Sequence, residues 1–296
     1  MSRPQQVLPG TFGLLTRRCT QRQFLLRPDA DTNQIVLYCL AVAAVRFAIE
    51  VLLPSVMSNH HHIVLFDRRG LRVQFTEHFH KLVARAMNAY RKRGENFWSS
   101  DPPSFVELGD RAAVIDKLVY AAANPVQAGL VERVAQWPGV NGLAAFLNGR
   151  TLTVPRPRHF FSPDGDLPEV ATITLAIPEE LGDAEAVRRE VRERVTAIEA
   201  AQAAERARTG ARVVGRRAVR RQSWRSAPAT PARRRRLRPR VAARDAAVRF
   251  KLLDRMAWFQ DDYRHARQAW LAGHPATFPV GTYWLARFAN VTVAAA

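Results

Sequence analysis

Apolar side chains in the first half of the chain recur at helical spacing in three segments, 31–50, 77–94 and 110–124. In the first segment they are Ile35, Tyr38, Cys39, Val42, Val45 and Ile49, and in the second they are Phe79, Leu82, Val83, Ala86, Met87 and Tyr90. Asp31 or Thr32 is a candidate N-cap for the first helix, and Asp110 for the third. We expect the third helix to stop before Pro125, because proline lacks the backbone N–H that the next turn needs.

Short apolar runs between these helices predict strands. They fall within 12–26, in 49–58, in 60–66 and at Ser104–Leu108, and a tight turn near Ser58-Asn59 joins the second and third. The order is therefore β-α-β-β-α-β-α. It predicts an α+β fold, a ferredoxin-like split βαβ arrangement around a central antiparallel sheet.

The pattern divides the chain into four parts. Residues 1–150 form the compact α+β domain, and residues 151–208 are a connecting segment with a β-like run at 170–177 and an Ala/Glu/Arg helix from 184. Residues 209–245 are rich in arginine and poor in aromatic residues, which predicts a flexible or fold-on-binding arm. Residues 246–296 regain large apolar side chains and predict a C-terminal helix followed by a β-like tail.

Composition narrows the class of protein. The two cysteines exclude a disulfide framework, no secretory signal is visible, and the longest apolar stretch is interrupted by Arg46, Glu50 and Pro54, so we expect a cytoplasmic protein. The formal net charge is +19, and residues 206–249 hold 16 basic residues against 1 acidic residue. A polyanion such as nucleic acid is the partner that this charge favours, although a high-GC genome also enriches arginine.

The run of three histidines at 60–62 is the first candidate site. If it is a strand, His60 and His62 point to one face and His61 to the other. Such an H-x-H pair can offer two imidazoles to one divalent ion, but it needs a third ligand. Ordinary strand histidines, or an exposed cluster, explain an isolated pair more simply than a metal site does.

Tyr120 and Asn124 form the second candidate site, because residues i and i+4 lie on one helix face. A phenol can act as a nucleophile, and an amide oxygen can bind a hard cation. The alternatives are a partly packed helix tyrosine and a C-terminal cap. Pro125 makes the same-face geometry approximate, because it disfavours helical backbone at Asn124.

Taken together, the two stretches resemble a known family. "VMSNHHHIVLF" resembles the M-P-N-H-x-H strand of the HUH single-tyrosine transposases. "YAAANPVQAGLVERVAQWPG" resembles the Y-I-x-x-N-P-V-R-A-G-L-V…W-P block of one branch, the REP-associated tyrosine transposases, and "YRKRGENFW" resembles that branch's Y-N-x-R-x-G-x-x-W helix end. The resemblance covers about residues 10–142. The chain departs from it at His61, usually a bulky apolar residue, at Ser58, usually proline, and at 121–123, which are alanines.

The resemblance implies a HUH transposase-like catalytic domain at 1–150. In it, His60, His62 and Asn124 bind Mg²⁺ or Mn²⁺. Tyr120 attacks a phosphodiester of single-stranded DNA in a hairpin substrate and forms a 5′-phosphotyrosine. The implied protein is a transposase, a nicking and strand-transfer enzyme associated with the nucleoid, and either a monomer or a homodimer.

Two other readings stay open from the sequence. One is a domesticated protein that binds DNA hairpins without cleaving them, with affinity from the basic segment and with Trp224 as a stacking residue. The expected nucleic-acid-binding residues are Arg233, Arg234, Arg235, Arg236, Arg238 and Arg240. The other is a structural zinc protein built on the histidines, which lacks cysteine ligands.

Overall fold

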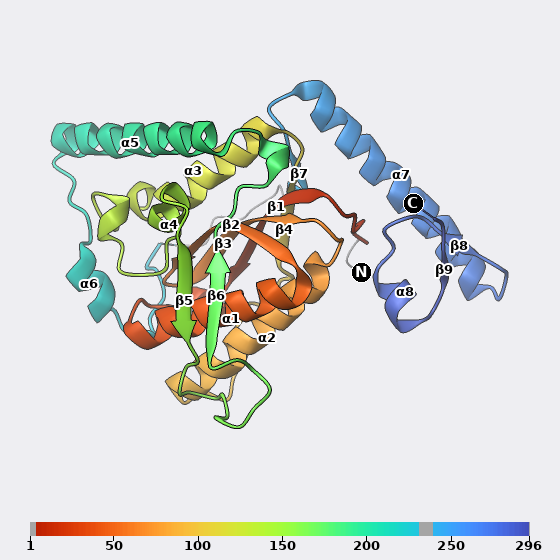
Figure 1. The fold of residues 1–296 in the computed structure, drawn as a ribbon, viewed down its shortest axis with the longest axis horizontal. Coiled ribbons are helices and arrows are strands. Elements are labelled where there is room, and N and C mark those ends of the chain that lie inside the picture. The colour runs from red at the N-terminus through yellow and green to blue at the C-terminus, as the bar shows by residue number, and fades with distance from the viewer. Residues whose placement is uncertain (1–3, 231–238, 296) are drawn as a thin grey trace.

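A five-stranded sheet lies at the centre of the computed structural model, which describes residues 4–230 and 239–295. The strands are β1 (Thr11–Arg18), β2 (Ile49–Met57), β3 (His60–Asp67), β4 (Ser104–Leu108) and β7 (Val241–Ala242). Their order is β2-β3-β1-β4-β7 (Figure 1). The three pairings among β2, β3, β1 and β4 are antiparallel in the ferredoxin-like order, which confirms the predicted fold class, and β7 adds a parallel edge strand.

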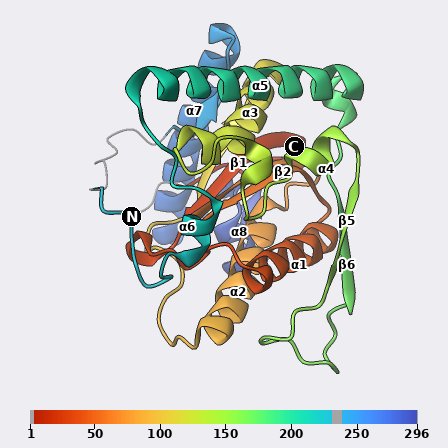
Figure 2. The ribbon, with the colours of Figure 1, turned by 90° about the vertical axis from the view of Figure 1, so that its left-hand side faces the viewer.

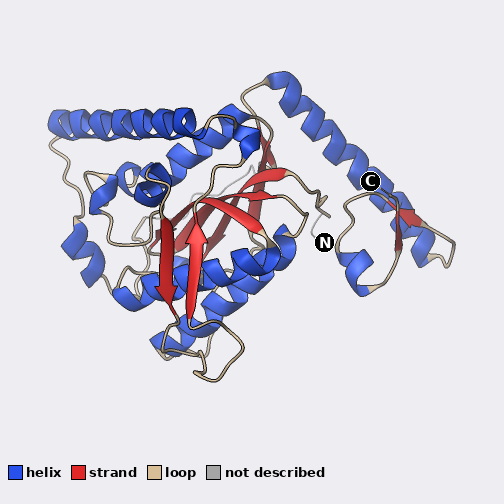
Figure 3. Cartoon of the chain, viewed as in Figure 1, coloured by secondary structure: helices blue, strands red, loops and turns tan. Residues whose placement is uncertain are grey.

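Helices cover both faces of the sheet (Figure 3). The helices α1 (Ala30–Phe47) and α2 (Arg72–Arg91) pack together on one face, and α3 (Arg111–Gln127) packs across β2 and β3 on the other. The N-cap of α1 is Asp29, whose side chain accepts from the Thr32 backbone N–H at 2.7 Å, and not the predicted Asp31 or Thr32. Asp110 caps α3 as predicted, by accepting from the Ala113 N–H at 2.7 Å.

The third helix does not end before Pro125, so that prediction is wrong. It runs three residues further than expected, to Gln127, with Pro125 inside it. Proline removes only one backbone donor, and the buried side chains of Pro125 and Val126 hold the last turn against the core. Asn124 therefore keeps helical backbone, and its carbonyl accepts from the Ala128 N–H at 2.9 Å.

The connecting segment packs on both sides of this core. Its elements are β5 (Thr151–Pro155), β6 (Val170–Thr174), a short 3-10 turn at 179–181 and α5 (Ala184–Thr209). The first 150 residues also contain α4 (Leu143–Leu147) and short 3-10 turns at 20–22 and 134–136. The β5–β6 hairpin lies against α1, and α5 lies along α3. Figure 2 shows α5 crossing above the sheet. Its contact stripe is Val187, Val191 and Val195, which are all buried and recur once per turn.

The arginine-rich segment, predicted as a flexible or fold-on-binding arm, contains two short elements where the structure describes it. Residues 209–230 include α6 (Arg216–Arg221), and residues 239–245 include β7, which pairs with β4. The buried Val219 anchors α6 to the core. Backbone hydrogen bonds to Phe24, Glu107, Gly109, Gly129 and Leu130 hold other described parts of the segment, and composition does not reveal them.

The C-terminal part extends away from the sheet edge (Figure 1). It consists of α7 (Ala246–Leu271), β8 (Thr277–Phe278), α8 (Trp284–Phe288) and β9 (Thr292–Val293). Phe259 is the only buried residue that α7 contributes. Within the described ranges, no helix is both long enough and apolar enough to span a bilayer.

Candidate active site

Strand β3 separates the three histidines as the alternation predicted. It pairs with β1 so that His60, His61 and His62 lie opposite Arg18, Arg17 and Thr16. The rings of His60 and His62 share one face, with centroids 4.9 Å apart, while His61 is on the opposite face. Three histidines on two faces cannot bind one ion.

Asn59 determines which nitrogen of His60 carries its proton. The amide nitrogen of Asn59 donates to the Arg22 carbonyl at 3.0 Å, so the amide oxygen faces His60 Nδ1 at 2.7 Å. An amide oxygen only accepts, so in neutral His60 Nδ1 carries the hydrogen and Nε2 carries the lone pair. His62 is oriented in a similar way, with Nδ1 at 2.9 Å from the Thr16 hydroxyl. Partners on the second ring nitrogen are typical of metal-binding histidines.

Helix α3 brings Tyr120 to this histidine pair. Its ring centroid is 5.1 Å from that of His62, and the residue is 38% exposed, so Tyr120 is accessible from solvent. Lys117, one turn earlier, places its ammonium 5.6 Å from the Tyr120 ring centroid. Lys117 was not among the residues predicted from the sequence, although its i, i+3 spacing from Tyr120 places it on the same helix face.

Asn124 lies one turn after Tyr120 on the same helix and is half-buried. Among the described residues, the ring contacts join His60, His62 and Tyr120, whereas the Asn124 side chain is placed near them only by its helical position. Its role as the third metal ligand stays a prediction.

The donors of this site are compatible with a divalent ion. Consider two imidazoles that bind one ion with metal–nitrogen distances of about 2.1 Å. If the nitrogen–metal–nitrogen angle lies between the octahedral and the tetrahedral value, the two ring centroids are roughly 4.5–5.3 Å apart. The 4.9 Å between His60 and His62 falls in that interval. Mg²⁺ prefers oxygen ligands, so two imidazole nitrogens favour Mn²⁺ of the two predicted ions. No cluster of three or more His, Cys, Asp or Glu side chains suited to a metal occurs in the described part of the chain.

His61 belongs to a separate buried cluster that the sequence did not predict. Its Nε2 lies 2.8 Å from Nε2 of His80 on α2, and Arg17 of β1 reaches His80 Nδ1 at 3.1 Å. Arg17 can only donate, so His80 donates from Nε2 to His61. Burial, with smaller contributions from His60 and Arg17, lowers the pKa of His61 to about 3, and burial also lowers the pKa of His80 well below its usual value. Both rings are therefore neutral at physiological pH.

Most of the predicted nucleic-acid-binding arginines lie outside the part of the chain that the structure describes. Arg233, Arg234, Arg235, Arg236 and Arg238 lie outside the described residues. Arg240 is described, and its backbone carbonyl accepts from the Glu107 N–H at 2.8 Å beside β7. Trp224 packs partly against the core, with the guanidinium groups of Arg225 and Arg93 at 4.9 and 5.8 Å from its ring centroid. These contacts leave Trp224 less open for base stacking than the sequence suggested.

Fold and site together define a split βαβ protein with an H-x-H strand facing a helix tyrosine. Comparison with solved structures finds "Structure of the REP associates tyrosine transposase bound to a REP hairpin", at 15% identity and a TM-score of 0.41, over 48% of this chain and 82% of that one. It also finds a putative transposase from Deinococcus radiodurans R1, at 16% identity and a TM-score of 0.28, over 36% of this chain and 85% of that one. No family model and no curated protein matches the chain.

Proposed function

We propose that this chain is a metal-dependent transposase that nicks and rejoins single-stranded DNA at hairpins through Tyr120. The main observation behind the proposal is that two motifs far apart in the sequence lie close together in space. The ring centroids of His62 of β3 and Tyr120 of α3 are 5.1 Å apart. The resemblance of both motifs to the REP-associated tyrosine transposases supports the same conclusion.

Tyr120 is the best nucleophile among the five tyrosines of the chain. Burial raises the pKa of each of the other four, Tyr38, Tyr90, Tyr263 and Tyr283, which disfavours their phenolate forms. Tyr120 alone lies beside the histidine pair and a lysine.

In the proposed reaction, the Tyr120 oxygen attacks the phosphorus of one phosphodiester and loses its proton. The bond from phosphorus to the 3′ oxygen breaks, the 3′ oxygen takes up a proton, and the 5′ phosphate stays on Tyr120. A second 3′ hydroxyl reverses these steps and rejoins the strand without a nucleotide cofactor. His60, His62 and Asn124 would hold the divalent ion, which supplies charge stabilisation at the phosphate when bound. Lys117 would contact a phosphate oxygen.

The test is covalent adduct formation. Single-stranded copies of the repeats that flank the gene, incubated with the protein and Mn²⁺, should give a protein–DNA adduct that survives denaturing electrophoresis. Tyr120→Phe should abolish the adduct, because the ring stays and the attacking oxygen is lost, whereas Tyr263→Phe should leave it intact. An adduct with Tyr120→Phe would refute the assignment. Binding without any adduct from the wild-type chain would favour the non-cleaving alternative.

A further inference from the structure

Helix α6 carries a concentration of arginines that the proposed chemistry does not use. Residues 206–230 contain eight arginines and no acidic residue. Four of them, Arg216, Arg217, Arg220 and Arg221, are exposed on α6, while Val219 between them is buried. We call Arg216, Arg217, Arg220 and Arg221 the α6 patch.

Among the described residues, the α6 patch has no acidic partner. Many arginines elsewhere are ion-paired, for example Arg194 and Arg244, which both contact Asp116. In the described part of the chain, by contrast, no ion pair or hydrogen bond engages the side chains of the α6 patch. Four uncompensated cations on six residues repel one another, so a site of this kind gains most from a bound anion.

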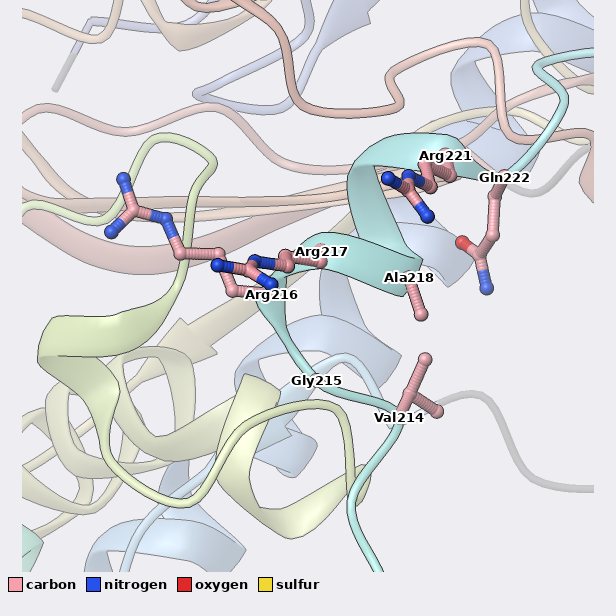
Figure 4. A pocket seen from close by; sticks show the side chains of 7 residues that line it. All are labelled: Val214, Gly215, Arg216, Arg217, Ala218, Arg221 and Gln222. Atoms are coloured by element: carbon pink, nitrogen blue, oxygen red, sulfur yellow. The ribbon is translucent and has the colours of Figure 1, made fainter.

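The patch borders an open hollow. The hollow has a volume of about 780 Å³ and is lined by Val214, Gly215, Arg216, Arg217, Ala218, Arg221 and Gln222. Figure 4 shows Arg216, Arg217 and Arg221 among the labelled residues that line this hollow. An open, cationic surface suits a chain of phosphates better than an enclosed small molecule.

Backbone hydrogen bonds place the patch beside the elements of the candidate active site. The N–H groups of Val214 and Gly215 donate to the carbonyls of Gly129 and Leu130, both at 2.9 Å, just after α3 ends. On the other side of α6, the Phe24 N–H donates to the Ser226 carbonyl at 2.8 Å. The same 22–24 loop accepts from the Asn59 side chain, next to His60.

We infer that the α6 patch binds the phosphate backbone of the single-stranded DNA that enters or leaves the Tyr120 site. The inference rests on the proposed function for the identity of the partner. It assigns to α6 a sequence-independent task, which is to hold the strand beside the histidine pair by charge. Arg217 and Arg221 are one helical turn apart and can contact neighbouring phosphates of an extended strand.

The experiment measures binding separately from cleavage. The full chain carrying Tyr120→Phe is titrated into a labelled single-stranded oligothymidylate, and Kd is determined by fluorescence anisotropy over a series of KCl concentrations. Adding R217Q/R221Q should weaken binding about tenfold or more at about 0.1 M salt. It should also make the slope of log K against log salt shallower by about 1.4, because two phosphate contacts are lost. R217K/R221K keeps both charges and should retain most of the slope.

The matched control is R189Q/R192Q, which removes two exposed arginines of α5. This control should change neither Kd nor slope beyond a small general effect. The inference is overturned if R217Q/R221Q binds like the parent, or if both pairs weaken binding equally.

Thermal melts verify that each variant is folded. If the wild-type chain forms no adduct but R217Q/R221Q still loses affinity, the proposed chemistry fails and the α6 surface stands. If adducts form and R217Q/R221Q binds normally, the proposed chemistry stands and the inference about the α6 patch fails.

Discussion

At the scale of residues, Asn59 links the turn between β2 and β3 to the chemistry of His60. Its amide oxygen holds the proton of His60 on Nδ1, which leaves the Nε2 lone pair for a metal ion. The amide itself is held by the Arg22 carbonyl. A single side chain thus sets both the tautomer and the orientation of one expected ligand.

We therefore expect Asn59→Ala to weaken Mn²⁺ binding about 10- to 100-fold, the usual cost of losing a partner of a metal-bound histidine. Titration of the apo-protein followed by the electron paramagnetic resonance signal of free Mn²⁺ measures this affinity. Asn148→Ala is the control, because its side chain donates to the Ala144 carbonyl on an exposed part of α4. Unchanged Mn²⁺ affinity in Asn59→Ala would show that Asn59 does not support the metal site.

At the scale of elements, the sequence predicted the features that follow from the periodic spacing of side chains in strands and helices. Period-two alternation separated His60 and His62 from His61, and helical spacing placed Tyr120 and Asn124 on α3. It did not predict the pairing of His61 with His80, because nothing local in 77–94 indicates which strand α2 will face. The course of α3 through Pro125 and the docking of α6 depend on tertiary packing and on backbone hydrogen bonds from residues far away in the chain.

The cluster between β1, β3 and α2 should make the fold sensitive to acid. Burial, and then His61 and Arg17, lower the pKa of His80 well below 6.5. Below pH 6.5 the unfolded chain binds a proton at this residue that the folded chain does not bind. The free energy of unfolding should therefore fall with decreasing pH, by up to about 1.4 kcal/mol per pH unit from this residue.

Urea unfolding at a series of pH values from about 7.5 to 5 tests this expectation. His80→Gln keeps polar atoms but cannot titrate there, so its pH dependence should be shallower, even if its stability at neutral pH is lower. Equal slopes for the wild-type chain and His80→Gln would mean that another group controls the acid response.

At the scale of the whole molecule, burial is distributed unevenly. The strands β2 and β3 are buried along almost their entire length, and α1, α2 and α3 pack on them. The helix α7 has 26 residues, yet it buries only Phe259 and exposes Phe250, Leu253 and Trp258 by 60%, 43% and 73%. One of its contacts with the sheet is the ion pair of Arg255 with Glu107 of β4, at 2.6 Å.

We expect this difference to appear in native-state hydrogen exchange. Peptides from β2 and β3 should exchange only when the whole domain unfolds, because nearly all residues of these two strands are buried. Peptides from α7 should exchange much sooner, through openings that leave the sheet intact, since little apolar area holds the helix in place. Exchange followed by mass spectrometry at several low urea concentrations distinguishes the two cases. Arg255→Gln should accelerate exchange in α7 and leave β2 and β3 unaffected. Equal protection in α7 and the sheet would show that the C-terminal part folds as one cooperative unit with the sheet.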